Sequence, residues 1–269
     1  MTRAAAAPLL AAALCLSGHV AAQEAPADPH AVQPERPTVA THAGTVAPGW
    51  IEFEVGAELD RYGGGAHGFA APLVAKIGLA PRLQLTAEES LSRPPGGSTA
   101  GVGDAAVGLK WRVAEHAPLL GDVALLPFLK VPAGSAATGT GTGTTDLTVI
   151  LISSHEFGAY SLDVNAGYTR RSGSGTTAPR AATMWTVSAG GPLSGALGWV
   201  GEVYGYPATS GPAGARAVVA VLGGPTLLVR KWLALDAGAI LPLAGAQPRA
   251  FYAGAVYNAG RLWGRPGPT

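Results

Sequence analysis

The chain has 269 residues, of which only 13% are charged, compared with about 25% in typical soluble domains. Its 18 Lys and Arg residues nearly balance its 17 Asp and Glu residues, and it shows no basic stripe of the kind that binds nucleic acid. A chain so poor in charge, with a mean hydropathy of +0.25, is typical of a protein whose outer surface meets lipid.

The first residues have the layout of a secretory signal peptide. Arg3 precedes an apolar run over residues 4–16, and small residues at 20–22 form a cleavage site. The apolar run is short for a transmembrane anchor, the alternative interpretation, which needs about 20 residues. We therefore expect cleavage after Ala22 and export from the cytoplasm. Cys15, the single cysteine, lies in this segment, so no disulfide is expected in the mature chain.

The remainder divides into a lead-in and a series of short segments. Residues 23–48 are rich in Pro, Ala and polar side chains without a sustained period, which predicts an extended periplasmic lead-in. From Trp50 onward, segments of about 9 to 13 residues have the length of tilted barrel strands. Uncharged stretches at 181–201 and 217–229 are interrupted by Gly and Pro, which disfavours helical spans. Twelve strands are predicted, at 50–60, 69–79, 82–93, 101–113, 122–132, 145–154, 159–171, 182–191, 196–206, 215–229, 232–241 and 249–263.

Residues 159–169 alternate between apolar and polar side chains almost without error. This period of two predicts a strand with one apolar and one polar face. In a soluble protein the apolar face packs on the core, whereas in a membrane barrel it meets lipid and the polar face lines the lumen. In the membrane case Asp163 and Asn165 face the lumen, and the lipid-facing side chains are Tyr160, Leu162, Val164, Ala166 and Tyr168.

The connections between the predicted strands favour the barrel over a soluble β-sandwich. When the twelve predicted strands are numbered in chain order, the connections that follow odd-numbered strands are long and rich in Gly, Ser, Thr and Pro, as at 133–144. Most connections that follow even-numbered strands are tight, with 114–121 as the exception. Short turns at one end and long loops at the other are typical of outer-membrane barrels. We therefore predict an all-β fold, an antiparallel transmembrane β-barrel of about twelve strands, with both termini on the periplasmic side. The predicted signal peptide, lead-in, barrel and C-terminal tail are residues 1–22, 23–48, 49–263 and 264–269.

Ionisable and polar residues on the predicted inner face are candidates for the lumen lining. Charges on the lipid face at mid-depth would cost a few kcal/mol each, so the inward assignment is favoured. One interpretation is a polar pore lining that sets selectivity; the other is a set of salt bridges that fills a narrow barrel, which the lead-in segment could also occlude. The candidates are Lys76, Glu88, Asp104, Lys110, Arg112, Lys130, Asp163, Asn165, Arg171 and Glu202.

Four stretches carry a family resemblance. The most specific is GVGDAAVGLKWRV at 101–113, and the others are ERPTVATHAGTVAPGWIEFEVG at 35–56, IGLAPRLQLTAE at 77–88 and LLPFLKVPAG at 125–134. Together they are similar to the Phenol MetA degradation family of outer-membrane transporters, named for the meta-pathway of phenol degradation. The resemblance implies a transporter or channel. It covers the N-terminal half well and the second half only through the strand pattern.

Other motifs carry little chemistry. The histidines that follow the signal peptide do not cluster, so no metal site is predicted, and the Gly/Thr run at 137–145 lacks the Lys and helix of a phosphate loop. Ser153, Ser154 and His155 are the candidates for a lipid-modifying hydrolase, in which a base must reach the nucleophile. We predict no catalytic residue, no cofactor and no enzyme activity.

The sequence therefore predicts a monomeric outer-membrane channel. It would pass small solutes, including aromatic or hydrophobic ones, by passive diffusion through a narrow polar lumen. Its expected partners are outer-membrane lipid, a small-molecule solute and the barrel-assembly machinery, with no nucleic acid. The alternatives are a lipid-modifying enzyme and a structural or surface-display barrel with a plugged lumen.

Overall fold

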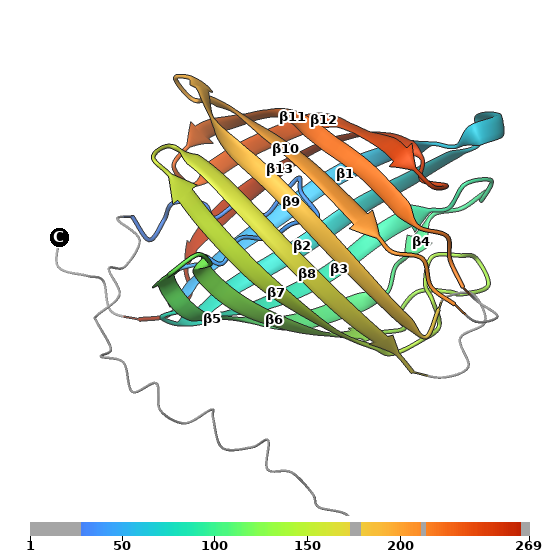
Figure 1. Ribbon diagram of the computed structural model, residues 1–269, viewed down its shortest axis with the longest axis horizontal. Coiled ribbons are helices and arrows are strands. Elements are labelled where there is room, and N and C mark those ends of the chain that lie inside the picture. The colour runs from blue at the N-terminus through green and yellow to red at the C-terminus, as the bar shows by residue number, and fades with distance from the viewer. Residues whose placement is uncertain (1–27, 173–178, 211–213, 265–269) are drawn as a thin grey trace, which may run out of the picture.

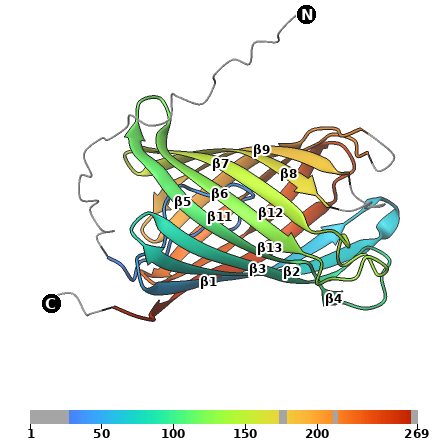
Figure 2. The ribbon, with the colours of Figure 1, turned by 90° about the horizontal axis from the view of Figure 1, so that it is seen from below.

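The computed structural model describes residues 28–172, 179–210 and 214–264. The predicted signal peptide and most of the predicted C-terminal tail lie outside this part of the chain. Most of the described residues after Pro48 belong to one antiparallel sheet that closes into a barrel (Figures 1 and 2). No helix in the described ranges has the length and apolar character to cross a membrane.

Twelve long strands form the wall, as the sequence predicted. Each pairs with its neighbours in chain order, and the pairings of β1 with β13 and of β2 with β3 complete the circle. The strands are β1 Trp50–Arg61, β2 His67–Ala80, β3 Leu83–Arg93, β5 Ala105–Ala117, β6 Gly121–Val131, β7 Asp146–Phe157, β8 Tyr160–Arg171, β9 Ala181–Ser194, β10 Leu197–Tyr206, β11 Val218–Arg230, β12 Leu233–Ala244 and β13 Arg249–Arg261.

Two details differ from the sequence prediction. Residues 101–113 do not form one strand: the two-residue strand β4 Gly101–Val102 is separated from β5 by Gly103 and Asp104, where Asp104 accepts hydrogen bonds from the facing loop. The expected long connection at 114–121 is short, because β5 continues to Ala117 and β6 begins at Gly121. All long loops therefore gather at one end of the barrel, the loop end, and all short turns at the other, the turn end (Figure 1).

The inside and outside of the wall have the polarity of a membrane barrel. In β8 the side chain of Asn165 is buried, whereas Val164 is 39% exposed and Tyr160 and Tyr168 are also exposed. The same inversion runs around the sheet, with polar residues inside and Leu, Val and aromatic residues outside. This answers the question that the alternation raised: the apolar face points away from the barrel axis, toward lipid.

The predicted periplasmic lead-in is placed differently from the expectation. Its described part, residues 28–48, lies inside the barrel, where Ala43 and Val46 are fully buried. The blue trace of this segment passes between the walls (Figure 1). A segment without period or strand propensity finds its backbone partners among the inward-facing side chains, because the sheet offers it no free edge.

The polarity of the wall makes a prediction about stability. Val164 lies near the middle of β8 on the outward face, so Val164→Arg places a charge in the centre of the lipid. We expect a loss of about 2–4 kcal/mol in the free energy of unfolding, measured by guanidinium titration of the mature chain refolded into phospholipid vesicles.

Leu119→Arg is the matched control. Leu119 is 96% exposed in the turn between β5 and β6, where an arginine reaches water, so we expect a change of about 0–1 kcal/mol. Equal effects of the two substitutions would contradict the assignment of the outward face to lipid.

Candidate functional site: the lumen and the segment that crosses it

The candidate site is the barrel interior together with residues 28–48, here called the lumen segment. The segment is held at the turn end, where Asp28 forms an ion pair of 2.7 Å with Lys231 and the Val32 amide donates to the Lys231 carbonyl at 2.8 Å. After crossing the lumen it enters β1 through Gly49, whose amide donates to the Gly78 carbonyl. Both ends of the segment are therefore fixed to the wall.

Carboxylates of the wall accept hydrogen bonds from the backbone of the lumen segment. Glu52 and Glu54 in β1 accept the amides of residues 33 and 35, both at 2.8 Å. Glu202 in β10 accepts two consecutive amides, from Val39 at 2.8 Å and from Ala40 at 2.7 Å. A buried amide without a partner would cost free energy comparable to a lost hydrogen bond, so these acids stabilise the segment in its position.

Neutral side chains extend the same pattern across the lumen. Asn165 accepts from the Thr41 amide at 2.7 Å and donates to the Thr41 carbonyl at 2.9 Å, so it acts as a backbone-like partner. Ser154 Oγ accepts from the Ala43 amide at 2.8 Å. The segment is thus held by bonds to its backbone from β1, β7, β8 and β10. Gln84, Lys76 and Asn258 make further bonds of this kind.

A fully buried cluster of charges joins β1 and β2. The ammonium of Lys76 lies 2.7 Å from Glu52 Oε1 and 2.5 Å from Glu54 Oε1. It also donates to the carbonyl of Gln33 in the lumen segment. Buried ions are tolerated when they are paired with an opposite charge. Lys76 supplies that charge for both acids, although Glu52 Oε1 makes no hydrogen bond among the described residues.

Lys110 in β5 is the second buried cation. It pairs with Glu35 of the lumen segment and donates to Thr41 Oγ1 and to the His42 carbonyl, each at 2.9 Å. Burial alone raises the pKa of the Glu35 carboxyl, but the ammonium groups of Lys110 and Lys76 outweigh it and hold that pKa well below its ordinary value. Glu35 is therefore ionised, and Lys110 binds the segment at four of its residues, the fourth through the Gly44 carbonyl at 3.3 Å.

Arg36 binds the opposite wall, where two glycines make room for it. Its guanidinium lies 3.3 Å from Asp236 in β12. A Cβ added at Gly56 or Gly254, which face each other across β1 and β13, would lie within 2.3 or 2.4 Å of guanidinium atoms. The absence of side chains at these two positions lets the arginine lie against the backbone of the wall.

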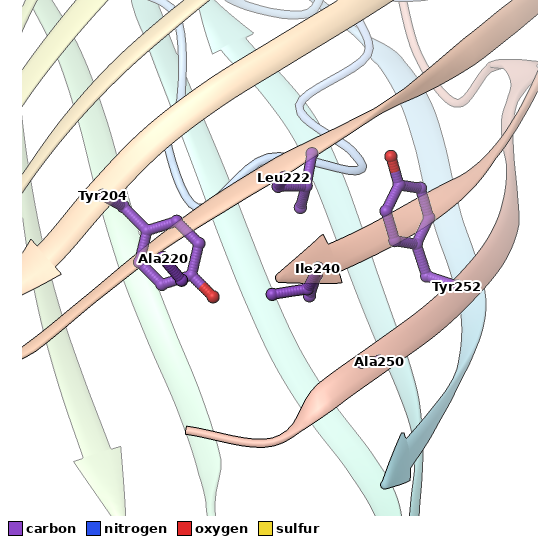
Figure 3. Close-up of a cluster of buried hydrophobic side chains, with 6 residues drawn as sticks. All are labelled: Tyr204, Ala220, Leu222, Ile240, Ala250 and Tyr252. Carbon is purple, nitrogen blue, oxygen red and sulfur yellow. The ribbon is translucent and has the colours of Figure 1, made fainter. Parts of the chain in front are cut away.

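The inner wall also carries two apolar clusters. One cluster points inward from β10, β11, β12 and β13 (Figure 3) and packs against Val39 of the lumen segment. The other includes Ala43 of the segment. The first cluster includes Ala220 and Leu222 of β11, so this strand is apolar on its inward as well as its outward face. Their members are Tyr204, Ala220, Leu222, Ile240, Ala250 and Tyr252 in the first, and Ala43, Ala124, Leu126 and Ile152 in the second.

Cavities remain beside the lumen segment, including one of about 570 Å³ between its residues Pro34 and Arg36 and the wall near Asp236, and two others lie toward the two ends of the barrel. A cavity of about 700 Å³ is lined by turn-end residues such as His116 and Glu156, and one of about 390 Å³ by Glu58, Glu88 and other residues toward the loop end. Arg36 and Thr38 line both. The segment therefore separates a turn-end cavity from a loop-end cavity.

Nine of the ten predicted lumen residues fall into two groups according to their partners, and Glu88 belongs to neither. Four of them contact the lumen segment: Lys76, Lys110, Asn165 and Glu202. Five have partners in the wall or the loops: Arg112 with Glu115 and Asp122, Lys130 with Asp104 and Asp146, Arg171 with Asp146, and Asp163 with Ser154. The tenth, Glu88, is half-buried and lines the loop-end cavity.

Several residues of the site were missing from the prediction. Glu52 and Glu54 alternate with Ile51, Phe53 and Val55, so the period of two in β1 identifies them as inward-facing. Asp236 and Asn258 follow from the same rule in β12 and β13. By contrast, the lumen segment carries no periodic signal, so the roles of Glu35 and Arg36 required the structure.

The candidate serine and histidine for hydrolysis are in contact, but the serine proton points away from the histidine. Ser153 Oγ lies 3.2 Å from His155 Nε2, and it donates its single proton to the Leu120 carbonyl at 2.6 Å. The histidine must then donate to the serine and cannot take its proton as a general base. Among the described residues, no group of three or more His, Cys, Asp or Glu side chains is arranged to hold a metal ion.

Comparison with known proteins agrees with this architecture. The COG4313 outer membrane channel from Pseudomonas putida F1 is similar in structure, with a TM-score of 0.64 and 12% identity over 84% of this chain and 99% of that chain. The KdgM porin has a TM-score of 0.51 and 9% identity over 77% of this chain and 98% of its own. No curated protein sequence matches the chain. The family described as the MetA-pathway of phenol degradation matches residues 35–257, and the chain belongs to this family of outer-membrane β-barrels.

Proposed function

We propose that the protein is an outer-membrane channel that passes small solutes by passive diffusion, and that the lumen segment obstructs its path at rest. The observation that carries the proposal is the position of the segment between the turn-end cavity and the loop-end cavity, both of which Arg36 and Thr38 of the segment line. The segment is held by hydrogen bonds and ion pairs, which water can replace when the segment moves. A solute would then find a continuous route.

The chemistry of the wall indicates the class of solute. Carboxylates and ammonium groups line one part of the interior, while the cluster around Leu222 and Tyr252 lines another with apolar surface. Val39 covers this apolar surface while the segment is in place. Displacement of the segment would expose a path with one polar and one apolar side. Small amphipathic solutes, including aromatic ones, match such a path better than sugars or ions.

A plugged barrel without transport is the second candidate. The number of wall strands that bond to the segment favours it, because each bond adds to the cost of displacement. The two candidates differ in whether the segment moves under native conditions, and a reversible cross-link tests this directly. The expected mature chain, which begins after Ala22, contains no other cysteine to complicate the experiment.

A disulfide between the segment and the wall should close the channel. The Ala43 amide lies 2.8 Å from Ser154 Oγ, so Ala43→Cys with Ser154→Cys brings two thiols within bonding range. In planar bilayers we expect oxidised protein to conduct less than the wild type and reduced protein to recover. Each single-cysteine variant is the control and should not respond to reductant. Equal conductance in the two redox states would favour the plugged barrel.

Removal of the cation that binds the segment should have the opposite effect. Lys110→Ala leaves the carboxylate of Glu35 buried without its partner, a loss of about 3–5 kcal/mol for the docked segment. We expect conductance to rise several-fold and the segment to become accessible to added protease. Arg112→Ala is the matched control, since the ion pairs of Arg112 within the described part of the chain are with Glu115 and Asp122 of the wall and not with the lumen segment. If both variants conduct like the wild type, docking through Lys110 does not limit passage.

A further inference from the structure

Three arginines and one histidine gather on the outward face of the barrel at the loop end. Arg61 at the end of β1 lies directly opposite Arg249 in β13 and opposite His67 in β2. Arg93 at the end of β3 lies opposite Phe69 of β2, which is two residues along β2 from His67. All four side chains are exposed and share the outward face with the lipid-facing residues. We call these four residues the arginine rim.

The arginine rim places like charges side by side. Residues directly opposite in an antiparallel pair have Cβ atoms about 4.5–5.5 Å apart, and like charges at this distance are destabilising. The outward faces of β1, β2 and β13 carry no carboxylate along their described lengths, and none of the ion pairs among described residues includes Arg61, Arg93 or Arg249. These three strands therefore offer no anion to offset the repulsion between Arg61 and Arg249; in β3, Glu89 has the same strand parity as Arg93 and lies four residues from it.

An apolar surface lies directly beneath the arginine rim. Leu59 and Phe251, opposite each other and two residues from Arg61 and Arg249, are 56% and 55% exposed. The guanidinium carbon of Arg61 lies 5.6 Å from the centre of the Phe251 ring. Cations are thus placed at the edge of the lipid-facing band, with an aliphatic and an aromatic side chain below them.

We propose that the arginine rim binds the phosphate-bearing headgroup of an outer-leaflet lipid, whose acyl chains lie against Leu59 and Phe251. Guanidinium groups bind phosphate in a bidentate manner, and one phosphate between Arg61 and Arg249 would convert their repulsion into two attractions. The apolar surface beneath favours a lipid over a free anion, because a soluble phosphate would leave Leu59 and Phe251 uncovered. The site lies outside the barrel and is independent of the proposed channel function; its leaflet follows from the predicted placement of the loops outside the cell.

Titration of the refolded mature chain in detergent with diphosphoryl lipid A, followed by native mass spectrometry, tests the proposal. The wild type should bind this lipid at least tenfold more tightly than Arg61→Gln with Arg249→Gln. The matched control is Arg230→Gln, an exposed arginine at the turn end of β11, which should bind like the wild type. Heat-modifiable migration in gels verifies that each variant is folded, and the two single variants replace the double variant if it does not fold.

Two further probes separate the source of the phosphate. Lipid A without phosphate should bind the wild type as weakly as diphosphoryl lipid A binds the double variant, and inorganic pyrophosphate should not compete at equal concentration. Equal binding of diphosphoryl lipid A by wild type and double variant would overturn the proposal. Full competition by pyrophosphate would also overturn it, because the rim would then be a site for soluble anions.

Discussion

At membrane depth, every backbone amide and carbonyl must find its partner within the protein, because lipid offers none. The wall meets this constraint by closing its sheet through β1 with β13 and β2 with β3. The lumen segment lies inside the same closed sheet and has no strand with which to pair. Side chains of the wall therefore take the place of a neighbouring strand, with Glu202 accepting consecutive amides and Asn165 bonding to both backbone groups of Thr41.

The buried carboxylates that accept backbone hydrogen bonds need positive charges beside them, and this need accounts for the buried lysines of the lumen. A buried carboxylate needs an opposite charge beside it, and Lys76 supplies that charge for both Glu52 and Glu54. Lys110 does the same for Glu35, which belongs to the segment itself. The charges of the lumen therefore form interdependent sets. A change at one member alters how firmly the segment is held, so the polar interior and the obstruction of the lumen have one physical origin.

The sequence was sufficient for the wall because a strand's period of two is a local signal. It assigned Asn165 to the lumen and Val164 to lipid, and it also contains the signal for Glu52, although the prediction did not use it. It was insufficient for the lumen segment, since bonds to backbone amides are made irrespective of residue type and leave no pattern. The strand from Val218 to Arg230 lacks the polar inward face that the other strands led us to expect. Its inward residues Ala220 and Leu222 belong to an apolar patch that a uniformly polar lumen did not anticipate.

Cations on the inner face of the barrel have carboxylate partners within the protein, whereas the arginines at the loop end of the outer face lie beside one another. Inside the barrel, Lys76 and Lys110 each have carboxylate partners in the wall or the segment. On the outside, Arg61 and Arg249 face one another across the β1–β13 pair, with lipid-facing Phe251 below. The lumen is closed off from anions by its own wall and must supply them itself. The outer face is bounded by a membrane whose headgroups carry phosphate, so the same electrostatic requirement can be met there by the lipid.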